Sequence, residues 1–149
     1  MREIDRQALV SHSAEQMYAL VDDVASYPQF LPWCRSVRVV ERNDQALVAT
    51  LQLHKGPLNV RFTTRNLLDP PRSIRITLIE GPFRSLEGAW SFEPVAGGGS
   101  RVRLKLRFAF AHALNAWLLD PVFEHMGRTL LDAFVKRAAR LHAATPATV

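Results

Sequence analysis

The order of two patterns constrains the fold most: a series of short strands comes first, and one long helix follows. Residues 102–110 place large apolar side chains at every second position, with Arg or Lys between them up to Phe108, which is typical of a strand with one buried face. Residues 121–142 instead repeat apolar side chains every three or four positions, which predicts a helix of about 33 Å. The other expected strands lie at 2–10, 37–40, 47–53, 58–62, 74–78 and 81–92.

Short turns join the expected strands, so they predict an antiparallel sheet whose apolar face needs a cover. The 121–142 helix is the only expected element long enough to cover it. The fold class is therefore α+β with a helix-grip arrangement, in which a curved antiparallel sheet of about seven strands wraps around the C-terminal helix. Residues 1–142 are expected to form one domain, and residues 143–149, which have no pattern, a disordered tail.

Three local signals refine this expectation. Ser13 and Gln16 have the spacing of a capping box and predict a short helix after the first strand. Asp120 followed by Pro121 predicts the start of the long helix. Residues 27–34 contain two prolines and four large apolar side chains, which predicts an irregular segment that either forms the rim of a cavity or plugs the core.

Composition limits the class of protein. The single cysteine, Cys34, excludes an internal disulfide. The chain starts without an apolar signal segment and has no apolar run long enough to cross a bilayer, so we expect a cytoplasmic protein. The net charge of +5, mostly from arginine, favours polyanionic partners such as RNA or acidic lipid headgroups.

Two motifs resemble the coenzyme Q-binding, START-like family of the polyketide cyclase/dehydrase superfamily. They are Tyr-Pro-Gln-Phe-Leu-Pro-Trp-Cys at 27–34 and Gly-Pro-Phe-Arg-Ser-Leu-Glu-Gly-Ala-Trp-Ser-Phe at 81–92, supported by Ala-Phe-Val-Lys-Arg-Ala at 133–138. The resemblance implies a START/Bet v 1-like fold with an apolar cavity. It also implies one of two roles: binding of ubiquinone or a related isoprenoid in support of respiration, or association with the large ribosomal subunit that blocks subunit joining.

The main functional expectation is non-catalytic binding of ubiquinone or a similar isoprenoid, with no required cofactor. A toxin that binds the 50S subunit is the alternative, and a polyketide cyclase-type enzyme is a third reading. We also expect a monomer that makes transient contact with the bacterial inner membrane. The expected ligand-binding residues are Tyr27, Phe30, Leu31, Trp33, Val60, Phe62, Ile76, Leu78, Phe83, Leu86, Trp90, Phe108, Phe110, Val122, Met126 and Leu130.

Periodicity alone does not choose between a cavity lined by these residues and a core that their side chains fill. Gly88 falls on the apolar side of its strand, where the absent side chain is expected to leave room.

A basic strand face is the candidate for RNA contact. Its side chains are expected to point away from the sheet's apolar face and to bind phosphate. The competing interpretation is that they pair across strands with Glu87 and Glu93. The candidate RNA-binding residues are Arg61, Arg65, Arg101, Arg103, Lys105 and Arg107.

The sequence shows no catalytic constellation. Its five histidines are scattered without a metal-ligand spacing. Cys34 follows a tryptophan and has no histidine nearby in sequence, so it is interpreted as a small packing residue. No metal site is expected.

Overall fold

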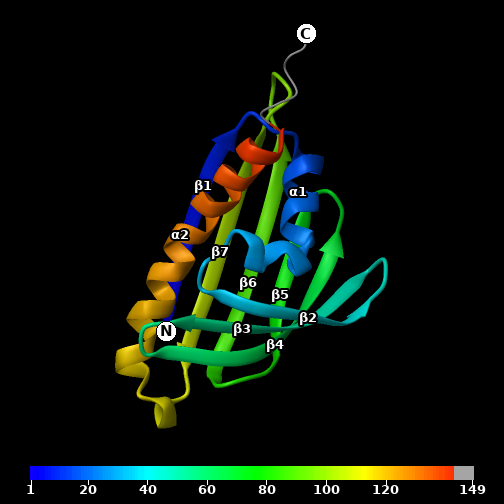
Figure 1. Cartoon of the computed structure of the whole chain (residues 1–149). Coiled ribbons are helices and arrows are strands. Elements are labelled where there is room, and N and C mark those ends of the chain that lie inside the picture. The colour runs from blue at the N-terminus through cyan, green and yellow to red at the C-terminus, as the bar shows by residue number, and fades with distance from the viewer. Residues whose placement is uncertain (143–149) are drawn as a thin grey trace.

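One curved antiparallel sheet forms the body of the molecule in the computed structural model, which describes residues 1–142 (Figure 1). The expected tail at 143–149 lies outside the described residues. Each strand pairs with its neighbour in the order β1-β7-β6-β5-β4-β3-β2. The strands are β1 (Arg2–Val10), β2 (Cys34–Arg42), β3 (Ala46–Lys55), β4 (Leu58–Asp69), β5 (Ser73–Glu80), β6 (Phe83–Pro94) and β7 (Ser100–Phe110).

Helices occupy the two long connections and the C-terminal end of the described chain. Helix α1 (Ala14–Asp22) and the 3-10 helix η1 (Val24–Gln29) join β1 to β2, and the 3-10 turn η2 (His112–Leu114) leads into helix α2 (Ala116–His142). Figure 1 shows α2 lying along β1 and β7, while β2, β3 and β4 curl round in front. This is the helix-grip arrangement that the sequence predicts.

Helix α2 approaches the sheet closely because of one glycine. A Cβ atom on Gly127 would lie 2.4 Å from Cδ1 of Ile4 on β1, so only a residue without a side chain fits here unless Ile4 moves. The helix buries one stripe against the sheet, as its 3.6-residue period predicts. The buried stripe is Leu119, Phe123, Met126, Gly127, Leu131, Phe134 and Ala138.

The predicted start of the long helix is wrong by five residues. The helix begins at Ala116, directly after Asn115, which has a positive φ of 56°. Pro121 therefore lies inside the helix and not at its first position. Asp120 does not cap the helix, because its carboxylate accepts a hydrogen bond of 3.1 Å from the backbone N–H of Phe110. This bond attaches the first turns of α2 to the end of β7.

The first helix and the segment after it follow the sequence only in part. The capping box is confirmed: the Ser13 hydroxyl accepts from the N–H of Gln16, and the Gln16 side chain accepts from the N–H of Ser13. Residues 27–29 are not irregular, however, since they end the 3-10 helix η1 with Pro28 inside it. Pro28 is the fifth of the six residues of this helix and donates no N–H bond to it, so the helix continues past proline with one backbone bond fewer.

Aromatic rings fill one end of the space between sheet and helix. Phe83 stacks on Phe110 with ring centres 4.3 Å apart, and Phe108 meets Phe123 edge to face at 4.6 Å. A second aromatic group surrounds Phe134, whose ring centre lies 5.2–5.3 Å from those of Tyr27, Phe30 and Trp90. Two separate groups of aromatic rings therefore pack between the sheet and the helices.

The Glu124 carboxylate on α2 predicts a defined acid sensitivity. It binds Arg2 on β1 and Arg128 one helical turn away, and hydrogen bonds from these two guanidinium groups lower its pKa below the usual 4.5. A carboxyl group whose pKa is depressed in the folded state contributes stability above its unfolded pKa and loses it as the pH falls through the folded value.

Glu124→Gln is therefore expected to lower the free energy of unfolding at pH 7 by about 1 kcal/mol, as partly exposed ion pairs do. The difference from the wild type should vanish in urea titrations below the folded pKa. An equal difference at pH 7 and at pH 2.5 would contradict the assigned role.

Candidate functional site

A cavity of about 110 Å³ lies between the inner face of the sheet and helix α2. Its wall is almost entirely apolar and combines residues from η1, the loop before β2, five strands and α2. The lining residues are Val24, Tyr27, Leu31, Trp33, Ala49, Leu51, Leu53, Phe62, Thr64, Asn66, Ile76, Leu86, Trp90, Leu106, Phe123, Met126, Gly127, Leu130 and Phe134.

Three polar side chains interrupt this wall. Thr64 and Asn66 on β4 point inward, are 5% and 8% exposed, and are joined by a long hydrogen bond of 3.5 Å from the threonine hydroxyl to the amide oxygen. Within residues 1–142 the amide nitrogen of Asn66 has no partner. The Tyr27 hydroxyl donates to the carbonyl oxygen of Val21. Within the described chain, the hydrogen-bond donors of the wall that are left for a ligand are the Asn66 amide and the indole N–H groups of Trp33 and Trp90.

The structure places nine of the sixteen predicted ligand-binding residues in the cavity wall. The nine are Tyr27, Leu31, Trp33, Phe62, Ile76, Leu86, Trp90, Met126 and Leu130. The other seven, which pack in the core clusters without lining the cavity, are Phe30, Val60, Leu78, Phe83, Phe108, Phe110 and Val122. Near the stacked rings of Phe83 and Phe110, the side chains meet and fill the core, so there the alternative of a filled core holds instead of a cavity.

Gly88 does not leave a gap in the wall. A Cβ atom at this position would lie 2.8 Å from Cδ1 of Leu106 and 3.6 Å from Cδ1 of Ile76. These side chains come from the two flanking strands and occupy the space that the sequence leaves open at Gly88. The glycine allows β5, β6 and β7 to pack, and the cavity lies beyond Leu106 and Ile76, which line it.

The described cavity wall contains few side chains that could act as a general acid or base. Tyr27 is its single titratable lining group, and burial raises the pKa of that hydroxyl well above its usual value. Burial also raises the pKa of the Cys34 thiol to about 11, so this thiol stays protonated at neutral pH. No group of three or more His, Cys, Asp or Glu side chains that could hold a metal is found among residues 1–142.

The basic face of β7 is largely neutralised by neighbouring carboxylates. Arg103 makes a two-point contact with Asp5 on β1, at 2.7 and 2.9 Å. Arg101 binds Glu93 at 2.8 Å, and Arg107 lies 3.4 Å from Glu87 on β6. The cross-strand pairing weighed against RNA contact is thus present for these three arginines.

Arg61 and Arg65 on β4 differ from the β7 arginines in this respect. Both are exposed, and neither forms an ion pair within the described chain. Lys105 on β7 is exposed and likewise lacks an ion-pair partner there. The candidate RNA-binding residues therefore divide into a paired set on β7 and an unpaired set centred on β4.

These features define a class of protein: a helix-grip domain that encloses a small apolar cavity and carries an uneven positive charge outside. Residues 10–135 match the family described as polyketide cyclase/dehydrase and lipid transport. The chain belongs to this START-like family.

Three proteins with different names are similar to this chain. The chain is 40% identical over 139 residues to the ribosome association toxin RatA of Pseudomonas aeruginosa, covering 93% of this chain and 96% of that protein. It is 27% identical to the mitochondrial coenzyme Q-binding protein COQ10 homolog B of Xenopus laevis, over 94% of this chain and 59% of that protein. The ZhuI aromatase/cyclase of a Streptomyces species shares the fold, with a TM-score of 0.83 at 20% identity over 97% of this chain and 98% of that chain.

No helix within the described residues is both long enough and apolar enough to cross a membrane.

Proposed function

We propose that this protein associates with the large ribosomal subunit and blocks its joining to the small subunit. The observation that carries the proposal is the near full-length similarity to a ribosome association toxin, at 40% identity over 93% of the chain. The unpaired cations on the outside of the sheet agree with an RNA-rich partner, because phosphate contacts dominate the affinity of proteins for nucleic acid. Ubiquinone binding, the main expectation from the sequence, is supported by a more distant relative, the coenzyme Q-binding protein COQ10 homolog B.

Sedimentation with purified ribosomal particles tests this function. The protein is expected to pellet with isolated 50S subunits at low salt, to be released as salt is raised, and to stay in the supernatant with 30S subunits. Equal recovery with both subunits, or with neither, would contradict the proposal.

A second candidate function rests on a different observation: the amide nitrogen of Asn66 has no partner in a largely apolar cavity wall. An amide N–H that faces an apolar cavity without a protein partner is available to donate to a ligand carbonyl. A carbonyl-bearing ring such as the ubiquinone headgroup has this chemistry. We therefore propose that the cavity binds a quinone-type ring, with Met126 and Leu130 against its apolar edge.

The size of the cavity limits what it holds as described. A cavity of 150 Å³ binds benzene, whereas pockets for larger ligands measure about 300–1,000 Å³. At about 110 Å³ the space is smaller than that benzene-binding cavity, so a substituted quinone ring would also require lining side chains to move. A prenylated ligand would therefore have to displace side chains of η1 or α2, or extend its tail out of the fold.

Quenching of tryptophan fluorescence tests the second function, because Trp33 and Trp90 line the cavity. A short-chain ubiquinone is expected to quench the protein saturably. Asn66→Leu should weaken this binding about tenfold, the effect of losing one hydrogen bond, whereas Asn59→Leu, an exposed asparagine on the same strand, should leave it unchanged. Linear, non-saturating quenching that is the same in all three proteins would contradict a site in the cavity.

A further inference from the structure

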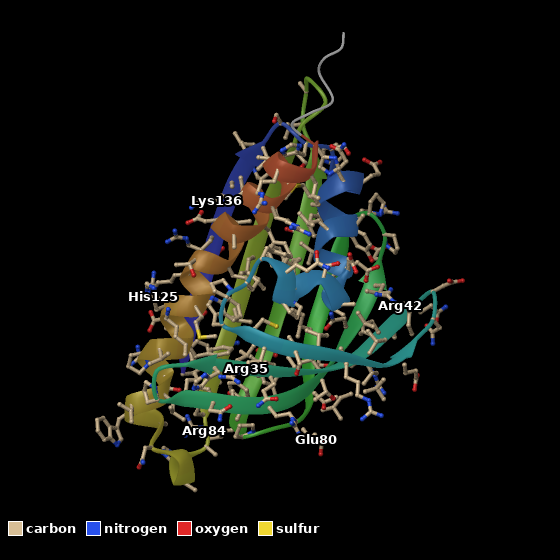
Figure 2. All side chains as sticks on the ribbon, in the orientation of Figure 1. Arg35, Arg42, Glu80, Arg84, His125 and Lys136 are labelled. Carbon is tan, nitrogen blue, oxygen red and sulfur yellow. The ribbon has the colours of Figure 1, made fainter. Side chains whose placement is uncertain are left out.

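Four arginines lie on the outer face of β2, β3 and β4, on the side of the sheet away from the cavity. They are Arg35 and Arg38 on β2 and Arg61 and Arg65 on β4, and all four are exposed. Only Arg61 and Arg65 belong to the sequence-predicted set. We call the four the β2–β4 arginine patch. Figure 2 labels Arg35 on β2, where this strand crosses the lower front of the molecule.

Strand register and contacts place these arginines on one face. Arg61 reaches Gln52 on β3 at 3.4 Å, and Gln52 pairs in register with Ser36 on β2. Arg38 is the register partner of Thr50, whose hydroxyl contacts that of Thr63, two residues before Arg65.

Arg35 completes the face through a contact of 2.9 Å with the His54 ring on β3. Arg61 and Arg65 lie about 13 Å apart along β4, and β2 is about 10 Å from β4. The patch is therefore compact enough to meet a single ligand surface.

The charge of the patch is not balanced by carboxylates. None of the four arginines forms an ion pair within residues 1–142. Glu41 and Glu80 are the carboxylates next to it in the strand register, opposite Val48 and Thr63, and neither is in salt-bridge range of a patch arginine. On the same sheet, by contrast, Arg101, Arg103 and Arg107 are all paired, so the outer face has one neutralised half and one cationic half.

We infer that the β2–β4 arginine patch binds the phosphate backbone of double-helical RNA. The inference rests on the proposed ribosome association and assigns that contact to one surface. Arginine binds phosphate in a two-point geometry that lysine lacks, and the patch consists of arginine alone. It follows that the β7 arginines contribute less, because the carboxylates beside them offset their charge and repel phosphate.

The other side chains of this face favour a duplex over a single strand. Polar groups that can hydrogen-bond phosphate or ribose hydroxyls lie beside the arginines: Ser36, Gln52 and Asn59. Thr63 is buried, and its hydroxyl contacts that of Thr50. A protein that binds single strands presents aromatic platforms on which bases stack. Here the ring available among the described residues of the patch, His54, is held by Arg35. Double-stranded RNA is instead recognised through its shape, its phosphates and its 2′-hydroxyls.

Two matched triple variants test the inference. Arg38→Gln, Arg61→Gln and Arg65→Gln removes three charges from the patch; Arg101→Gln, Arg103→Gln and Arg107→Gln removes three from the paired face. Both change exposed or half-exposed side chains, and thermal melts verify that both fold. Binding is measured to purified 50S subunits, to a short synthetic RNA duplex and to vesicles containing anionic lipid, each over a range of salt concentrations.

The patch variant is expected to bind 50S subunits and the duplex at least about tenfold more weakly, with a salt slope shallower by about two to three. The β7 variant should stay within about threefold of the wild type. Equal losses in both variants, or none in the patch variant, would overturn the inference while leaving ribosome association intact.

Two further outcomes separate the inference from the proposed function. If the wild type binds the duplex through the patch but does not bind 50S subunits, the proposed function fails and the RNA-binding surface stands. If the wild type binds anionic vesicles through the patch and not the duplex, the partner is a membrane and the inference is wrong.

Discussion

Phe134→Asp is expected to abolish the folded state. The Phe134 side chain is fully buried and touches rings from η1, β6 and the segment before β2. Removing such a ring costs about 3–5 kcal/mol, and an unpaired carboxylate in the same place costs several more. This sum reaches the whole stability of a typical domain, about 5–15 kcal/mol. Circular dichroism of the purified variant should show neither the cooperative melt nor the far-UV spectrum of the wild type.

Leu141→Asp is the matched control for this change. It lies on the same helix and receives the same side chain, but it is 52% exposed. Surface substitutions of this kind change stability by about 0.5 kcal/mol or less. If both variants melted at the same temperature, α2 would not pack on the sheet through the Phe134 face.

Phe108→Ala should lower the free energy of unfolding by about 3–5 kcal/mol, the range for a buried phenylalanine. Phe108 is fully buried and packs edge to face on Phe123 and Phe110, where the rigid aromatic group has little freedom to collapse into the space. For a chain of this size the melting temperature should fall by roughly 6–20 °C. Chemical denaturation in urea measures the change directly.

Trp117→Ala provides the comparison, since Trp117 is 76% exposed at the start of α2. It removes a larger ring from a place where few atoms surround it, so the effect should stay near 0.5 kcal/mol. A loss at Trp117 as large as the loss at Phe108 would mean that the aromatic cluster is not the packed end of the core.

The alternation of apolar and charged residues predicted which side chains of a strand face inward. It did not predict every partner on the neighbouring strands. The pattern of 102–110 placed Val102, Leu104 and Phe108 inside and the arginines outside, as observed. It also offered Glu87 and Glu93 as partners, and both form ion pairs. Asp5 was missed as the partner of Arg103, because the two residues are 98 positions apart and meet only once β1 pairs with β7.

The cavity was harder to predict than the sheet, because its shape depends on side chains that come from several strands. Its polar members, Thr64 and Asn66, stand in a strand whose apolar alternation ends at Phe62. The period of two still placed them on the inner face, and continuing it past Phe62 would have found them. The filled space beside Gly88 had no such signal, since it depends on which rotamers Leu106 and Ile76 adopt on neighbouring strands.

The start of α2 was predicted wrongly because Asp120 bonds to the end of β7 instead of capping the helix. The pair Asp120-Pro121 fits the first turn of a helix, but the carboxylate bonds to Phe110 across the β7–α2 connection. Local sequence alone does not reveal that contact. Asn115 was the available signal, since asparagine tolerates the positive φ found just before the helix.

The rate of 70S formation tests ribosome association most directly. Purified 50S subunits are incubated with the protein, 30S subunits are added at a magnesium concentration that favours joining, and light scattering follows the appearance of 70S particles. The protein is expected to suppress the signal in proportion to its occupancy of 50S subunits, and the β2–β4 patch variant to suppress it only at higher concentration. Full 70S formation at a saturating concentration of folded wild-type protein would contradict the proposed function.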